Sequence, residues 1–231
     1  MTLPFPLAHL RAASPDCWWG ARSLGEPRPA RRGAGPAALI ALPLLLFGIP
    51  SPAVAQAEGG ATGAAGRARD AETAATMVAH VGRQVGTLAD KLEKLARAMP
   101  EETYDWRPMK GVRSVGEVYA HVAGDNYFVA ALLGLEVPEE SGVTTDGATV
   151  GAYEEKTHGK EAILAGLTHS FQVMREALAN VEDDPSREIS LRGNSLTAGD
   201  LYVRATTHLH EHLGQAIAYA RMNRVVPPWS R

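Results

Sequence analysis

The chain of 231 residues contains a single cysteine, Cys17, and none after it. One cysteine cannot form an intramolecular disulfide, so a disulfide-stapled scaffold is excluded. The lack of any later cysteine also excludes a cysteine-ligated zinc finger and a cysteine nucleophile in the remainder of the chain. Any thiol chemistry there needs a thiol from another molecule.

Positive charge is scarce in most of the sequence. Of the 23 basic and 26 acidic side chains, five arginines and two acids fall in the first 55 residues. This leaves 18 basic and 24 acidic side chains for residues 56–231, a net charge of −6. Because binding to nucleic acid needs a basic face, nucleic acid is not expected as a partner.

Long hydrophobic runs are also missing. The longest apolar run, Ala37–Ile49, is interrupted by Pro43, and a membrane-spanning helix needs about 20 apolar residues. Arg28, Arg31 and Arg32 precede this run, and the small-residue triplet Ala53-Val54-Ala55 follows it. This order is typical of a secretory signal peptide rather than of a stable membrane span.

We therefore predict a signal peptide at residues 1–55, cleavage near Ala55, and export to the periplasm or the exterior. A membrane anchor is the alternative. The translation start and the choice between the general and the twin-arginine route stay open. Residues 56–73 are rich in Ala and Gly with few large apolar side chains, which predicts a flexible linker.

Residues 74–231 show helical periodicity, with apolar side chains at spacings of three and four. Two capping-box patterns, Ser114-Val-Gly-Glu117 and Thr197-Ala-Gly-Asp200, mark the starts of the second and fourth helices. The expected helices cover about Ala74–Met99, Ser114–Gly134, Tyr153–Val181 and Thr197–Arg224, with a polar loop at 136–149. Glu188–Arg192 could form a brief extended segment, but no convincing strand pattern is present. The predicted fold is all-α, a four-helix bundle.

Three histidines occupy positions at which the helical periodicity predicts an apolar residue such as leucine. His121 lies in the stripe of the second helix, and His208 and His212 lie one turn apart in the fourth. Imidazoles at i and i+4 share a helix face and can bind one metal ion together. A third imidazole from a facing helix makes a three-nitrogen site with open positions, as in catalytic zinc sites. The alternative is a set of core histidines hydrogen-bonded to their neighbours.

Neighbouring residues have candidate roles beside this site. Asp125, one turn after His121, could orient a ligand imidazole or act as a catalytic base, or simply hydrogen-bond to the fourth helix. Gln215 follows His212 by three positions and could support that ligand or pack at a helix crossing. Glu117 could also support the site, although capping explains it. Aromatic residues that could wall a pocket or fill the core are Trp106, Tyr127 and Tyr219.

Several short motifs together resemble the DinB/YfiT-like family over about residues 74–230. They are Trp106-Arg107-Pro108, Ser114-Val-Gly-Glu117, His121, His208-x-x-x-His212-x-Gly214-Gln215 and Pro227-Pro228. The resemblance implies a four-helix bundle that binds a divalent metal through His121, His208 and His212. Zinc and nickel are the first candidates, and iron and manganese are alternatives. It also implies a possible homodimer.

The best-understood relatives in that family transfer thiols such as bacillithiol or mycothiol with the help of a metal. The resemblance therefore implies a metal-dependent enzyme that transfers a thiol to a small molecule. The predicted signal peptide adds export, and water as the nucleophile would make the protein a hydrolase instead. An exported protein meets little cytosolic thiol, which argues against a thiol co-substrate. The alternatives are a non-catalytic metal- or ligand-binding bundle of the cell envelope and a purely structural bundle.

Overall fold

A computed structural model describes residues 59–180 and 185–230. Within these residues the chain forms five α-helices and one two-stranded sheet. The elements are α1 (Gly59–Ala98), α2 (Val115–Leu132), α3 (Ala148–Lys156), α4 (Lys160–Asn180), β1 (Glu188–Leu191), β2 (Asn194–Thr197) and α5 (Ala198–Met222). The predicted signal peptide lies outside the described residues. No helix among the described residues is long and apolar enough to cross a membrane.

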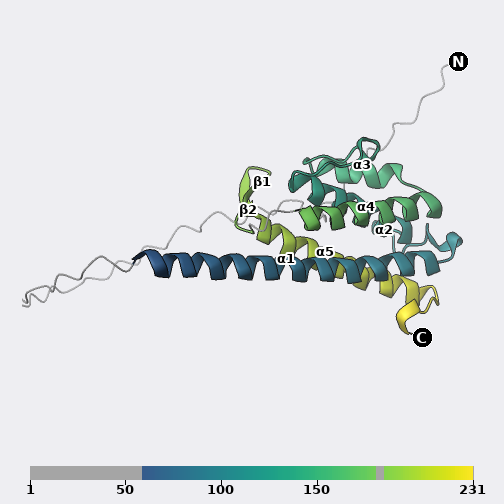
Figure 1. The fold of residues 1–231 in the computed structure, drawn as a ribbon. Coiled ribbons are helices and arrows are strands. Elements are labelled where there is room, and N and C mark those ends of the chain that lie inside the picture. The colour runs from purple at the N-terminus through teal and green to yellow at the C-terminus, as the bar shows by residue number, and fades with distance from the viewer. Residues whose placement is uncertain (1–58, 181–184, 231) are drawn as a thin grey trace, which may run out of the picture.

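Four long helices enclose one hydrophobic core (Figure 1). Helix α1 packs against α4 and α5, and α2 packs against the same two helices, which closes a ring of contacts. Leu92, Phe128 and Leu167, from three different helices, are fully buried between them. The prediction of a predominantly helical domain is therefore confirmed, with one additional short helix, α3.

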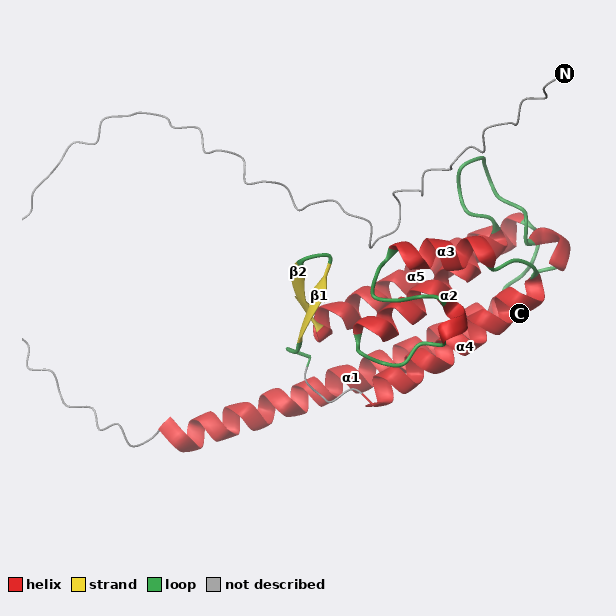
Figure 2. Ribbon diagram, turned by 90° about the horizontal axis from the view of Figure 1, so that it is seen from above, coloured by secondary structure: helices red, strands yellow, loops and turns green. Residues whose placement is uncertain are grey.

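Helix α1 carries the apolar stripe that the sequence predicts. Val81, Val85 and Leu92 are buried along it, and the helix ends at Ala98, just before Pro100. A proline ends a helix because it has no N–H to donate and its ring clashes with the preceding turn. The helix begins at Gly59 rather than at Ala74, so it includes residues that we expected to form a linker. Its first turns project beyond the other helices (Figure 2).

Helix α2 begins with the predicted capping box. The Ser114 hydroxyl accepts a hydrogen bond from the Glu117 backbone N–H at 3.2 Å, and the Glu117 carboxylate accepts one from the Ser114 N–H at 2.8 Å. The helix is buried on nearly all sides because it contacts α3, α4 and α5. More of this helix therefore lies in the core than the single apolar stripe predicted from the sequence.

The prediction of one continuous third helix from Tyr153 to Val181 is wrong. The structure has α3 and α4 in its place, separated at Thr157–Gly159. The Thr157 hydroxyl caps the end of α3 by donating to the Tyr153 carbonyl at 2.7 Å, and Gly159 turns the chain with φ +80°. A positive φ favours glycine because side chains crowd the backbone there. The break lets α3 pack across α2.

The brief extended segment suggested at Glu188–Arg192 is present as β1, and it pairs with a second strand that the sequence analysis did not predict. Strands β1 and β2 pair antiparallel, with Ile189 opposite Leu196. Their two-residue turn has φ 52° at Arg192 and φ 78° at Gly193, as hairpin turns of the primed type require. Strands of four residues are too short to show a clear alternation. The hairpin leads into Thr197, which caps α5 with Asp200 in the second predicted capping box.

Candidate metal centre

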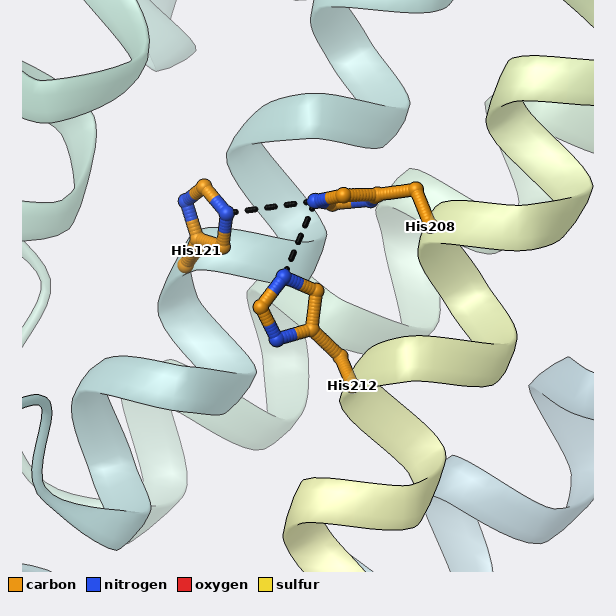
Figure 3. A group of neighbouring side chains, drawn as sticks. All are labelled: His121, His208 and His212. Carbon is orange, nitrogen blue, oxygen red and sulfur yellow. Dashed lines mark hydrogen bonds between the residues drawn. The ribbon is translucent and has the colours of Figure 1, made fainter. Parts of the chain in front are cut away.

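Three histidine side chains meet between α2 and α5 (Figure 3). The Nε2 atom of His208 lies 3.2 Å from that of His121 and 2.9 Å from that of His212. The side chains are buried, with exposed fractions of 1% for His121, 4% for His208 and 7% for His212. The helical spacing of His208 and His212 and the packing of α2 on α5 thus bring all three predicted ligands to one point.

The distances between these nitrogens fit one shared cation. Imidazole nitrogens bind divalent zinc at about 2.0–2.1 Å, so two ligands at ordinary angles lie about 3.0–3.5 Å apart. A hydrogen bond between two imidazoles needs one N–H and one lone pair. The single Nε2 of His208 cannot supply a proton to both of its neighbours. A metal ion would satisfy all three nitrogens together.

Asp125 adds a negative charge beside the three nitrogens. Its Oδ2 atom lies 2.8 Å from Nε2 of His208 and 3.2 Å from Nε2 of His121. The residue is 2% exposed, and neither carboxylate oxygen has a hydrogen bond of standard geometry from the described residues. Burying a carboxylate without full compensation is costly. A divalent cation at this position would offset that cost.

The pKa values of Asp125 and His212 bear on which charges the cluster holds. Burial raises the pKa of Asp125, but the neighbouring His121 and His208 outweigh burial and hold its pKa below the usual value. Burial, together with His208 and His121, lowers the pKa of His212 to about 3. At neutral pH the site therefore presents a carboxylate and at least one neutral imidazole with a lone pair free for a metal.

Groups outside the cluster support two of the histidines. Oε1 of Gln215, for which the sequence left a supporting role and packing at a helix crossing open, lies 2.9 Å from Nδ1 of His212. Oε2 of Glu154 lies 3.4 Å from Nδ1 of His121, and Oε1 of Glu154 accepts a hydrogen bond from Nε of Arg113 at 2.8 Å. Burial raises the pKa of Glu154, but His121 and Arg113 together bring it below its usual value. Such outer partners orient metal-binding imidazoles.

Sequence reasoning did not find Glu154 or the role of Arg113. Glu154 belongs to α3, which the sequence analysis merged with α4, and it has no helical spacing to any of the three histidines. No local signal in the sequence points to it. Only the packing of α3 across α2 brings its carboxylate to His121.

The remaining predicted residues divide into two groups. Trp106 and Tyr219 lie beside the site, with rings packed edge to face at a centroid distance of 5.5 Å, and Tyr219 bonds to Gln215. Glu117 instead pairs with Arg107 through both carboxylate oxygens, at 2.9 and 3.0 Å, and caps α2. Tyr127 faces α4, where its hydroxyl lies 3.1 Å from Nδ1 of His169.

Comparison with known proteins agrees with the resemblance drawn from the motifs. The DinB superfamily model matches residues 84–216. A search of curated proteins finds no match. Among solved structures, a DinB-like protein from Bacillus cereus ATCC 10987 is 16% identical and aligns over 61% of this chain and 89% of its own, with a TM-score of 0.49.

A second solved structure, the DinB-like protein YjoA from Bacillus subtilis, is 17% identical. It aligns over 66% of this chain and 98% of its own length, with a TM-score of 0.51. At that identity the likeness concerns the fold alone. The family match spans more than half of the sequence and includes all three histidines of the cluster, and the chain belongs to the DinB superfamily.

Proposed function

We propose that this protein binds one divalent metal ion through His121, His208 and His212 and uses it to transform a small molecule. The observation that carries the proposal is the meeting of three buried Nε2 atoms beside the buried carboxylate of Asp125. Three protein nitrogens leave coordination positions for a substrate, in contrast to a closed structural site. Zinc and nickel are our first candidates, and a neighbouring carboxylate also suits iron and manganese.

When bound, a metal supplies Lewis acidity, which polarises a substrate or lowers the pKa of a bound thiol or water. The chain's own contribution is the base. Oδ2 of Asp125 points toward the nitrogens of His208 and His121 and is free of standard hydrogen bonds from the described residues. It is therefore placed to take a proton from a nucleophile bound at the cluster.

The nucleophile decides between thiol transfer and hydrolysis. Residues 56–231 contain no cysteine, so a thiol would have to come from a co-substrate. We also propose that the protein is exported, which is supported by the order of arginines, apolar run and small-residue triplet before residue 56. Export favours water as the nucleophile and hence a hydrolase. N-terminal sequencing of the protein recovered from a bacterial envelope fraction tests export, and a mature chain starting at Gln56 is the expected result.

A non-catalytic metal-binding role is the second candidate. It is favoured by the low exposure of the three ligands, none above 7%, which limits access of a substrate to the cluster. Turnover with any substrate that depends on the metal would exclude this alternative.

The primary experiment measures metal content by elemental mass spectrometry on the full chain purified without an affinity tag. We expect about one equivalent in the parent and a loss in both His121→Ala and His208→Ala. His210→Ala is the matched control, because His210 lies on the same helix but is exposed and bonds to the Thr206 carbonyl. Absence of metal from the parent after incubation with zinc, nickel, iron and manganese would refute the proposal.

Asp125→Asn separates the metal-binding role from the catalytic one. The variant keeps the shape of the side chain but loses the negative charge and the proton acceptor. We expect it to retain the ion with an affinity about tenfold lower and to lose any metal-dependent turnover. Unchanged turnover in Asp125→Asn would remove Asp125 from the catalytic role.

A further inference from the structure

A chain of hydrogen bonds leads from the backbone of Arg113 to His212. The Arg113 carbonyl can only accept, so the Tyr219 hydroxyl, 3.2 Å away, donates to it. The Tyr219 oxygen is then left to accept from Nε2 of Gln215 at 3.1 Å. This fixes the Gln215 amide with Oε1 toward Nδ1 of His212, at 2.9 Å.

The end of this chain determines which nitrogen of His212 carries the proton. Oε1 of Gln215 only accepts, so Nδ1 of His212 must be the N–H. A neutral imidazole has one proton, and Nε2 of His212 is therefore left with its lone pair. That lone pair faces the cluster of nitrogens, where a metal ligand needs it.

A second chain of contacts leads from the side chain of the same arginine to His121, and its last contact does not have standard hydrogen-bond geometry. The guanidinium Nε of Arg113 donates to Oε1 of Glu154 at 2.8 Å, and Oε2 of Glu154 lies 3.4 Å from Nδ1 of His121. A carboxylate only accepts, so Glu154 favours a proton on Nδ1 of His121. Oδ2 of Asp125, 3.2 Å from Nε2 of the same ring, favours a proton on Nε2 instead. The side chains of Arg113 and Glu154 are largely shielded from solvent, with exposed fractions of 19% and 15%.

The common origin of the two chains is held rigidly. Arg113 immediately precedes Ser114, the capping residue of α2. The next two residues are tied to the preceding loop by backbone hydrogen bonds from Val115 to Trp106 at 3.0 Å and from Gly116 to Tyr104 at 2.8 Å. The start of α2 therefore gives Arg113 a fixed place from which to act on α3 and α5.

We propose that Arg113 is the common anchor of two chains of contacts that prepare His212 and His121 for metal binding. The hydrogen bonds through Tyr219 and Gln215 set the tautomer of His212, and the contact through Glu154 holds the proton of His121 on Nδ1 against the attraction of Asp125 for a proton on Nε2. Arg113, Tyr219, Gln215 and Glu154 are positioning residues and do not touch the metal. The functional role inferred for these residues rests on the proposed metal site. The tautomers themselves exist without a metal and are tested in its absence.

The first test is Tyr219→Phe in the full chain. Phenylalanine keeps the ring against Trp106 but removes the hydroxyl, so the Gln215 amide is free to turn its NH2 group toward His212. Long-range ¹H–¹⁵N NMR of the metal-free protein reports which imidazole nitrogen is protonated. We expect the parent to show Nδ1–H at His212, Tyr219→Phe to show a mixture of tautomers, and metal affinity, measured by chelator competition, to fall about tenfold.

A rescue variant distinguishes this role from a merely structural one. In Gln215→Glu both side-chain oxygens only accept, so Nδ1–H of His212 is retained whether or not Tyr219 has its hydroxyl. The double variant Gln215→Glu/Tyr219→Phe is expected to keep the Nδ1–H tautomer that Tyr219→Phe alone loses. Tyr127→Phe is the matched control, because it removes a tyrosine hydroxyl that faces His169 on α4 instead.

The second chain is tested by Glu154→Gln. Arg113 needs an acceptor, so the new amide oxygen turns to Arg113 and its NH2 group faces Nδ1 of His121. We expect the protonated nitrogen of His121 to change from Nδ1 to Nε2, and metal affinity to fall 10- to 100-fold. Glu155→Gln, at the exposed neighbouring position, should change neither.

Unchanged tautomers in Tyr219→Phe and Glu154→Gln overturn the inference, even if both variants bind metal more weakly. A parent that shows the expected tautomers but takes up no metal refutes the proposed function and leaves the two chains intact. The two failures are therefore distinguishable, because the NMR measurement needs no metal.

Discussion

Replacement of His208 by alanine is the most direct test of metal binding at the histidine cluster. The Nε2 atom of His208 lies 3.2 Å from that of His121 and 2.9 Å from that of His212, and Oδ2 of Asp125 lies 2.8 Å from it. His208→Ala leaves two imidazoles on different helices and takes away the nitrogen between them. We expect the stabilisation by metal to be lost in this variant.

The size of the effect follows from mass action. A ligand that binds only the folded state at 100 times its Kd adds about 2.7 kcal/mol to the free energy of unfolding. For a domain of this size 1 kcal/mol moves the Tm by about 2–4 °C, so the parent should gain about 5–11 °C. His208→Ala should gain almost nothing. Each protein is compared with its own metal-free sample, so the cost of the cavity left by the imidazole cancels.

The assay is a thermal melt of the full chain with and without metal, monitored by far-UV circular dichroism. His210→Ala controls for loss of a histidine from the same helix and should keep the parental gain. An equal gain in His208→Ala and in the parent would show that the stabilising ion binds elsewhere, and would refute the assignment of His208.

Two other predictions concern pH and the cap of α2. His212 has its pKa lowered to about 3 by burial and by its histidine neighbours, whereas an unfolded histidine takes up its proton near pH 6.5. The free energy of unfolding of the metal-free protein should therefore fall as the pH is lowered from about 6.5 toward 3. Its dependence on pH should be weaker in His212→Asn. An equal pH dependence of the two proteins in denaturant melts would contradict this prediction. Glu117→Ala removes the partner of Ser114 and Arg107 and should cost about 1 kcal/mol of stability without changing metal content. Loss of metal from this variant would give Glu117 a direct role at the site.

The parts of the fold that the sequence predicts are those that depend on near neighbours in the chain. The capping boxes at Ser114 and Thr197 need residues only three positions apart, and both form as predicted. The pairing of His208 with His212 needs only one helical turn. His121 could be joined to them because it replaces an apolar residue on a stripe that must face the core.

The parts that were missed depend on packing or on short elements. The break between α3 and α4 rests on Thr157 and Gly159 within an otherwise helical pattern, where glycine alone gives only a weak signal. Glu154 reaches His121 because α3 folds across α2, a contact between residues 33 positions apart that no local periodicity encodes. The β1–β2 hairpin has strands too short for their alternation to stand out.

The composition of the core itself argues that the cluster has a function. Leucines at positions 121, 208 and 212 would continue the apolar stripes and would bury no polar atoms. The chain instead buries three imidazoles and the carboxylate of Asp125 there, which lowers stability unless every polar group is satisfied. A single proton on Nε2 of His208 cannot be donated to both neighbouring Nε2 atoms, whereas one divalent cation would bind all three nitrogens. Such a conflict between local packing rules and the residues present is expected at functional sites, and the metal ion that we propose would resolve it.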